Sequence, residues 1–133
     1  MRELRLPYQD AEQQFRRMVF NVVARNQDDH TKNIAFLMDQ SGQWRLSPAF
    51  DVIYAYNPTG DWTSRHQMSI NGKRDDFSKD DLLQVGKEMN IKSRLKIIDE
   101  IVVVVANWSD FAKNAKVEPS QIKSIGKAHR LLR

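Results

Sequence analysis

The sequence predicts a mostly helical α+β domain with one small β-hairpin. Three stretches, residues 10–24, 93–112 and 120–132, carry apolar residues at the three- and four-residue spacing of one helix face. Short apolar runs on either side of the turn at 39–42 predict the hairpin. The length of 133 residues allows one hydrophobic core, so we expect a single domain over residues 1–133.

The composition is that of a globular protein. Hydrophobic residues make up 41% of the chain and charged residues 29%, which argues against intrinsic disorder and fibrous repeats. The longest apolar run, residues 101–106, is far shorter than the roughly 20 residues of a membrane-spanning helix. The chain has no cysteine and its N-terminus lacks a signal-peptide pattern, which excludes disulfides and thiolate metal sites. We therefore expect a soluble protein of a bacterial-type cytoplasm.

The first half of the chain is predicted to run from a helix through a polar loop into the hairpin. Residues 10–24 form the helix, and the loop at 25–33 has no apolar side chain at all. Residues 34–38 predict a buried strand and residues 43–46 an alternating second strand. The expected inner face of the helix consists of Phe15, Met18, Val19, Val22 and Val23.

The segment after the hairpin is rich in aromatic residues and holds one acid. Pro48 ends the second strand. Asp51 lies between apolar neighbours in the segment 50–56, so we expect it to be buried with a partner or a metal. Residues 57–77 are predicted to be mostly loop, with an extended piece before the turn at Asn71-Gly72.

Within that loop, three side chains could contribute to a binding surface: Trp62, Arg65 and His66. An ordinary exposed loop is the favoured interpretation, and an acceptor or partner surface is the alternative.

The remainder of the chain is predicted to be helical. Ser78 has the character of an N-cap for a helix that runs to about Met89, with Asp81 where a capping box has Glu or Gln. One long helix is expected over 93–112; its run Val102–Val105 has strand propensity, but the polar flanks favour a buried helix.

The net charge of +4 is concentrated at the C-terminal end. Residues 112–133 contain six Lys and Arg residues and a single acid, Glu118, whereas the preceding residues are close to neutral. Such a basic tail can bind nucleic acid or an acidic partner, but a helix with a solvated basic face is the simpler interpretation.

The most informative functional feature is the polar loop, in which Asp28, His30 and Asn33 form the pattern D-x-H-x-x-N. In protein kinases a catalytic Asp accepts the proton of the substrate hydroxyl, and an Asn five positions later holds Mg²⁺. A second metal-binding Asp follows an intervening hairpin. Asp28 and Asn33 stand five positions apart, and Asp51 follows the predicted hairpin eighteen positions after Asn33.

The residue types suit phosphoryl transfer. Asn33 offers a carbonyl oxygen and Asp51 a carboxylate, both hard ligands that Mg²⁺ accepts, while Asp28 is free to act as the base. Alone, Asp and Asn at this spacing are typical of turns; the helix, loop and hairpin around them favour a phosphotransfer-type site. For His30 we favour a structural role over acid–base or metal chemistry, and Asp29 and Lys32 are expected to be solvated or substrate-facing.

With these motifs in place, residues 20–38 and 44–52 resemble the C-terminal part of the HipA family of serine/threonine kinase toxins. The resemblance is close over residues 10–73, which include Asn71-Gly72-Lys73, and looser beyond. It implies the helical C-lobe of a protein-kinase-like fold, in which the small hairpin carries the catalytic and metal-binding loops. Phe50-Asp51-Val52 lacks the glycine of the kinase D-F-G motif, as this family also does.

The resemblance also implies roles for individual residues. Asp28 is expected to be the catalytic base, and Asn33 and Asp51 are expected to bind Mg²⁺. The residues expected to contact the cofactor, Mg²⁺ with ATP, are His30, Lys32, Asn33 and Asp51.

A complete kinase needs a lobe with a phosphate-covering loop and a strand lysine. Only 27 residues precede Asp28 and none of them is glycine, so we expect this nucleotide-clamping N-terminal lobe to be absent from the chain. The chain alone is then expected to be inactive.

Three functions remain open at this point. The resemblance implies transfer of the ATP γ-phosphate to Ser or Thr of a protein substrate, such as an aminoacyl-tRNA synthetase, in a toxin–antitoxin system with a HipB-like antitoxin. The first alternative is a stand-alone module that binds an antitoxin, DNA or an N-lobe supplied in trans. The second is a small-molecule phosphotransferase, against which the pattern Arg-Asn-x-Asp-Asp-His-x-Lys-Asn argues.

Overall fold

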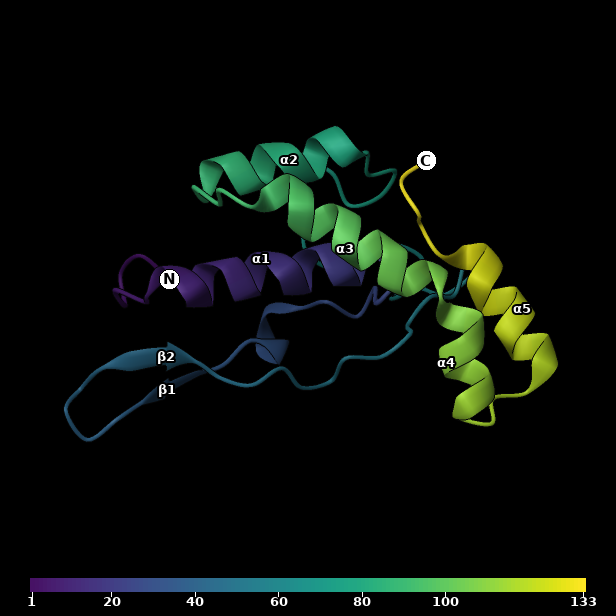
Figure 1. Cartoon of the computed structure of the whole chain (residues 1–133), viewed down its shortest axis with the longest axis horizontal. Coiled ribbons are helices and arrows are strands. Elements are labelled where there is room, and N and C mark those ends of the chain that lie inside the picture. Colours follow the sequence, from purple (N-terminus) through teal and green to yellow (C-terminus); the bar gives the residue numbers. More distant parts are fainter.

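A computed structural model describes residues 1–133 and shows five α-helices and one two-stranded antiparallel hairpin (Figure 1). This confirms the predicted mixture of helices with a hairpin. No helix combines the length and the apolar character needed to cross a membrane. The elements are α1 (Tyr8–Val23), the 3₁₀ turn η1 (Thr31–Asn33), β1 (Phe36–Met38), β2 (Trp44–Leu46), α2 (Lys79–Glu88), α3 (Arg94–Ala106), α4 (Trp108–Asn114) and α5 (Pro119–Ala128).

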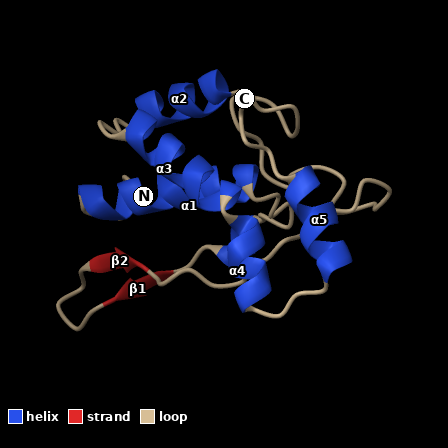
Figure 2. Ribbon diagram, turned by 45° about the vertical axis from the view of Figure 1, so that its right-hand side comes forward, coloured by secondary structure: helices blue, strands red, loops and turns tan.

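The hydrophobic core lies where α1, α2 and α3 pack together, with α3 in contact with both other helices (Figure 2). Each large aliphatic or aromatic side chain buried there stabilises the fold by about 1.5–3 kcal/mol relative to an exposed one. The predicted inner face of α1 is confirmed for Phe15, Val19, Val22 and Val23, which are fully buried. The principal partners from other segments are Ile70, Phe77, Leu82, Ile91, Ile97, Ile98, Ile101 and Val105.

The hairpin extends away from the helices, with Phe36 opposite Leu46 and Met38 opposite Trp44 (Figure 1). The prediction of a buried first strand is wrong, because Leu37 and Met38 are each more than half exposed. The reason is tertiary: no second layer of structure covers this part of the hairpin, so its apolar side chains remain in solvent.

Asp10 attaches the hairpin to α1. Its carboxylate accepts two bonds from the Arg45 guanidinium, each 2.9 Å long, and a third from the Leu46 N–H at 2.8 Å. Asp10 is buried, and the hydrogen bonds from Arg45 lower the pKa of its carboxyl group. The Arg17 guanidinium adds a bond to the Ser47 carbonyl at 2.7 Å, so Asp10 and Arg17 of α1 together fix the direction of the hairpin.

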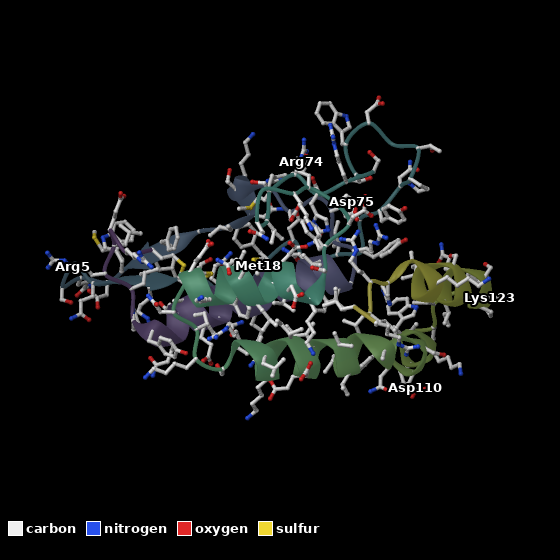
Figure 3. The ribbon with its side chains drawn as sticks, turned by 90° about the horizontal axis from the view of Figure 1, so that it is seen from above. Arg5, Met18, Arg74, Asp75, Asp110 and Lys123 are labelled. Carbon is white, nitrogen blue, oxygen red and sulfur yellow. The ribbon has the colours of Figure 1, made fainter.

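The loop and capping predictions for residues 57–81 are confirmed. The first part of the loop projects from the body (Figure 3), and the turn at Asn71-Gly72 has φ values of 50° and 75°. Ser78 caps α2 in a reciprocal capping box with Asp81. Asp81 also accepts from the Asn71 amide and the Lys73 ammonium group, each at 2.8 Å, and these bonds lower its pKa far below the ordinary value.

The prediction of one helix over 93–112 is wrong. The chain forms α3 and α4 with a break at Asn107, whose N–H donates to Val104 and whose carbonyl accepts from Asp110. The break allows the Trp108 indole to donate to the Ile122 carbonyl at 3.0 Å. Val102–Val105 is helical, as predicted, but the prediction that this run is buried is wrong for Val103 and Val104, which are at least half exposed.

The predicted helix over 120–132 is too long. α5 ends at Ala128, and the chain returns to the body, where the Arg130 N–H donates to the Val23 carbonyl at 2.8 Å. The Arg130 guanidinium forms an ion pair with Asp75 and lies 5.1 Å from the centre of the Phe77 ring. Arg130 is thus part of the folded body instead of a solvated basic face.

Candidate functional site

The site begins where α1 ends. The Asn26 N–H donates to the Asn21 carbonyl at 3.0 Å, and Arg25 adopts a positive φ of 59°, a closing geometry in which glycine is the usual residue. The Arg25 side chain donates to the Ala128 carbonyl and to the Gln27 side chain, which offsets the cost of this backbone conformation. Its guanidinium carbon lies 4.4 Å from the centre of the Tyr56 ring. Its burial, together with the nearby Arg130 guanidinium, lowers the pKa of Arg25.

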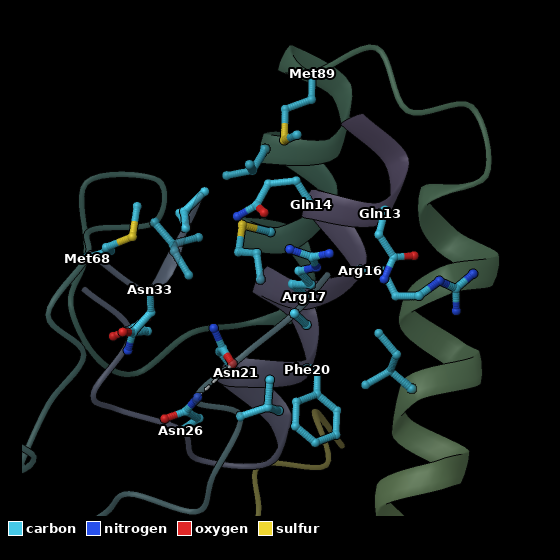
Figure 4. A pocket seen from close by; sticks show the side chains of 18 of the residues that line it. Gln13, Gln14, Arg16, Arg17, Phe20, Asn21, Asn26, Asn33, Met68 and Met89 are labelled. Carbon is cyan, nitrogen blue, oxygen red and sulfur yellow. Dashed lines mark hydrogen bonds between the residues drawn. The ribbon is translucent and has the colours of Figure 1, made fainter. Parts of the chain in front are cut away.

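The two predicted functional loops lie side by side. The Gln27 N–H donates to the Ala55 carbonyl at 2.9 Å, and the Ala55 N–H donates to the Arg25 carbonyl at 3.1 Å. The Asn26 amide donates to the Asp51 carbonyl at 3.4 Å and to the Asn21 side chain at 3.1 Å (Figure 4). This short parallel bridge brings the segment after the hairpin back to the loop before it.

Asn33 is bonded to both other residues predicted to act in phosphoryl transfer, Asp28 and Asp51. It ends η1, and its Nδ2 donates to the Asp28 backbone carbonyl at 3.2 Å and to Asp51 Oδ2 at 3.0 Å. His30 Nε2 lies 3.7 Å from Asp28 Oδ1, and its buried Nδ1 has no hydrogen-bond partner. Lys32 is exposed on η1. The fold therefore gathers Asp28, His30, Asn33 and Asp51 into one cluster.

Asp51 is not buried, contrary to the prediction. Its side chain is exposed, and Phe50, Val52 and Ile53 around it are each nearly half exposed. The apolar neighbours did not indicate burial, because the segment lies on the surface, where the Asn26 and Asn33 side chains bond Asp51. Asp51 also adopts a positive φ of 53°, an uncommon conformation for a residue other than glycine.

A groove of about 1260 Å³ opens beside the cluster, along α1 (Figure 4). His30, Asn33 and Asp51 lie among its lining residues, while α1 and α3 contribute apolar side chains such as Met18, Phe20 and Val103. A largely apolar cavity with a few polar groups at one place is the usual form of a ligand site.

The pair Asn33 and Asp51 fits Mg²⁺ by its chemistry. It offers one amide and one carboxylate 3.0 Å apart, and Mg²⁺ usually takes one or two protein ligands and completes its octahedron with waters and phosphate oxygens. The amide would have to present Oδ1, because Nδ2 faces the carboxylate now. No group of three or more His, Asp or Glu side chains is arranged to hold a metal unaided.

Asp29, which was expected to be solvated or substrate-facing, is buried. Its Oδ2 lies 2.8 Å from His66 Nδ1, and its Oδ1 accepts from the Gln67 N–H at 2.8 Å. His66 is fully buried with its ring edge toward Phe77, so its expected place in an exposed loop is also wrong. The pair joins residues 37 positions apart, and no local spacing signals it.

Gln27 is a second residue that the sequence interpretation missed. It is fully buried, and its Nε2 donates to the Thr63 carbonyl at 3.0 Å. Polar residues in an Asn- and Asp-rich loop are usually exposed, so this burial had no sequence signal either.

The comparison with protein families gives one match. A family model described as HipA-like C-terminal domain matches residues 1–124. A search of curated proteins finds no match to the chain.

Proposed function

The chain belongs to the family of HipA-like C-terminal domains, and from this premise we propose that it is the catalytic part of a toxin kinase. The kinase transfers the γ-phosphate of ATP to a Ser or Thr hydroxyl of a protein substrate. The observation that carries the proposal is the Asn33 amide, which bonds both the Asp28 backbone and the Asp51 carboxylate at the edge of the groove. Under this proposal the helices and hairpin are a kinase-like C-lobe over residues 1–133.

Each residue of the cluster has a separate task. Asp28, whose side chain is partly exposed, orients the attacking hydroxyl and accepts its proton. His30, 3.7 Å away, orients the Asp28 carboxylate. Asn33 and Asp51 would hold the metal, and Lys32, exposed on η1, would be available to the phosphates. Mg²⁺ with ATP supplies the phosphoryl group and neutralises the charge on its oxygens.

Family membership suggests a toxin–antitoxin context. We therefore include a HipB-like antitoxin among the partners, and an aminoacyl-tRNA synthetase among the candidate protein substrates.

A nucleotide-clamping lobe completes the proposed enzyme, supplied by another segment or another chain. Phe50, Val52 and Ile53 next to Asp51 are nearly half exposed, and Leu95, Val103 and Val104 of α3 are exposed along the same groove. Exposed apolar side chains gathered at one groove are typical of an interaction site. The lobe would cover it and enclose ATP over Asn33 and Asp51.

The test is ATP-dependent phosphorylation of protein by this chain combined with such a lobe. Asp28→Asn and Asp51→Asn should each lower the rate at least about 100-fold, because one removes the base and the other a metal ligand. Asp110→Asn, an exposed acid on α4, is the matched control and should keep full activity. Activity that survives both site substitutions would contradict the assignment.

A further inference from the structure

Asp51 is held by two asparagine side chains of the loop at 25–33. Asn33 Nδ2 donates to its carboxylate at 3.0 Å, and Asn26 Nδ2 donates to its backbone carbonyl at 3.4 Å. Asp51 makes no other hydrogen bond in the structure. It needs such support, because it is exposed and its positive φ of 53° is uncommon for a residue other than glycine.

The Asn26 side chain has one orientation that suits its surroundings. It is 3% exposed, and its Nδ2 also donates to Asn21 Oδ1 at 3.1 Å (Figure 4). Both groups in front of Nδ2 are acceptors, so turning the amide over would place Oδ1 against two oxygens. Its Oδ1 is buried without a partner, so the bonds of Nδ2 alone hold the side chain. Asn21 therefore fixes the rotamer with which Asn26 reaches Asp51.

Main-chain bonds fix the backbone of Asn26 as well. Its N–H donates to the Asn21 carbonyl, which ties it to the end of α1. The residues on either side of it, Arg25 and Gln27, both pair with Ala55 in the segment after the hairpin. Asn26 is thus a fixed point between α1 and the segment that carries the acid.

The two bonds to Asp51 differ in what metal binding does to them. Asn33 would have to present Oδ1 to share Mg²⁺ with Asp51, and its Nδ2 would then leave the Asp51 carboxylate. The bond from Asn26 goes to the backbone carbonyl and leaves both carboxylate oxygens free for the metal. It is therefore the one hydrogen bond of Asp51 that metal binding does not break.

We propose that Asn26, held by Asn21, is the positioning residue of the metal site; this inference rests on the proposed kinase function. Asn26 contacts neither metal nor nucleotide. It keeps the Asp51 backbone in the conformation from which the carboxylate binds Mg²⁺, after Asn33 has turned to the metal. Residues that orient metal ligands in this way typically change metal affinity about 10- to 100-fold when they are substituted.

The experiment measures nucleotide binding, so that no phosphoryl transfer is needed. The Kd of a fluorescent, non-hydrolysable ATP analogue for the chain combined with its nucleotide-clamping lobe is determined with Mg²⁺ and with EDTA. The ratio of the two constants gives the tightening that Mg²⁺ supplies. Asn26→Ala should reduce this tightening about 10-fold, while the Kd in EDTA stays within about twofold.

A second variant tests the route through Asn21. Asn21→Ala leaves the backbone bonds of Asn26 in place and should reduce the tightening about threefold, the effect of one lost hydrogen bond. Because Asn21 acts through Asn26, the double variant should be no weaker than Asn26→Ala alone. If Asn26→Ala does not fold, Asn21→Ala decides the question.

Gln27→Ala is the matched control. Gln27 is the next residue along the loop and is also buried, but its side chain bonds Thr63 and Arg25 and not Asp51. Its loss should lower the stability of the loop and leave the tightening by Mg²⁺ within about twofold.

The outcomes separate the two proposals. Asp51→Asn should abolish the tightening by Mg²⁺. If it does so while Asn26→Ala, or Asn21→Ala in its place, keeps the full tightening, the positioning role is wrong and the kinase assignment stands. An equal loss in Gln27→Ala would also overturn that role, because general loosening of the loop would then be the cause. No tightening by Mg²⁺ in the unsubstituted protein would overturn the metal site of the proposed function, and the role of Asn26 with it.

Discussion

At the scale of single residues, buried acids organise this protein more than its exposed ones do. Asp10, Asp29 and Asp81 are all buried, and each accepts hydrogen bonds from residues outside its own helix or loop. Burial of a carboxylate is costly unless its oxygens are bonded, so each acid specifies one arrangement of its partners. Asp29 shows this best, because it joins the polar loop at 25–33 to His66 and Gln67 in the loop at 57–77.

Asp81 makes a prediction about pH. Bonds from Lys73, Ser78 and Asn71 lower its pKa in the folded state well below the ordinary 3.8, so its contribution is complete above about pH 4. As the pH falls below 3.8, the unfolded chain takes up a proton before the folded one does, and this contribution is lost. Asp81→Asn should destabilise the fold by roughly 3 kcal/mol at pH 7.

Urea unfolding of both proteins at pH 7 and pH 2.5 measures this effect. The difference in the free energy of unfolding between the parent and Asp81→Asn should be smaller at pH 2.5 than at pH 7. An equal difference in unfolding free energy at the two pH values would show that the charge of Asp81 contributes nothing to stability.

At the scale of elements, the joints between helices and strands depend on contacts outside each element. α3 and α4 are continuous in their apolar pattern, yet the chain breaks at Asn107, and Trp108 directly after the break donates to the Ile122 carbonyl of α5. The hairpin is likewise too small to be stable alone, since two isolated strands are marginal in water. The position of the hairpin relative to the site is set by its hydrogen bonds to α1.

Asp10→Asn should loosen the attachment of the hairpin to α1, leaving the bond from Arg17 to the Ser47 carbonyl in place. The amide can no longer accept three bonds as an anion does, and we expect a loss of about 2 kcal/mol in the free energy of unfolding. The Leu46 amide should exchange with deuterium much faster. The exchange rates of amides inside α3 should change only as far as the free energy of global unfolding changes. Asp110→Asn serves as the control, and an unchanged Leu46 exchange rate would refute the role of Asp10.

At the scale of the whole molecule, the C-terminal tail returns to the end of α1, close to the site. The C-terminal tail packs on the end of α1 through Arg130, and Arg25 bonds Ala128. The tail thereby supports the residues that lead to Asp28, although the family match ends at residue 124.

Removal of residues 129–133 tests this support. Loss of the backbone bond and the Arg130 ion pair should cost roughly 2 kcal/mol of stability, and the Gln27 amide, bonded to Ala55, should exchange faster. Removal of Arg133 alone, which is exposed, is the matched control. A Gln27 amide that is equally protected in the shortened chain would show that the tail does not support the loop.

The sequence by itself determined the features whose physics is local. The apolar spacing of α1, the cap at Ser78, the turn at Asn71-Gly72 and the hairpin all depend on residues within a few positions of one another. The D-x-H-x-x-N spacing and the later Asp51 predict a phosphotransfer-type site in the same way, and this stays a prediction.

Only the tertiary structure decided which side chains are shielded from water. Asp51 is exposed and Asp29 is buried, the reverse of what their immediate neighbours suggested. The bonds from Asp29 to His66 and from Gln27 to Thr63 span 37 and 36 positions. Whether such a pair forms depends on how α1, the loops and the C-terminal tail pack together, and hydrophobic burial, which drives that packing, has no fixed spacing along the chain.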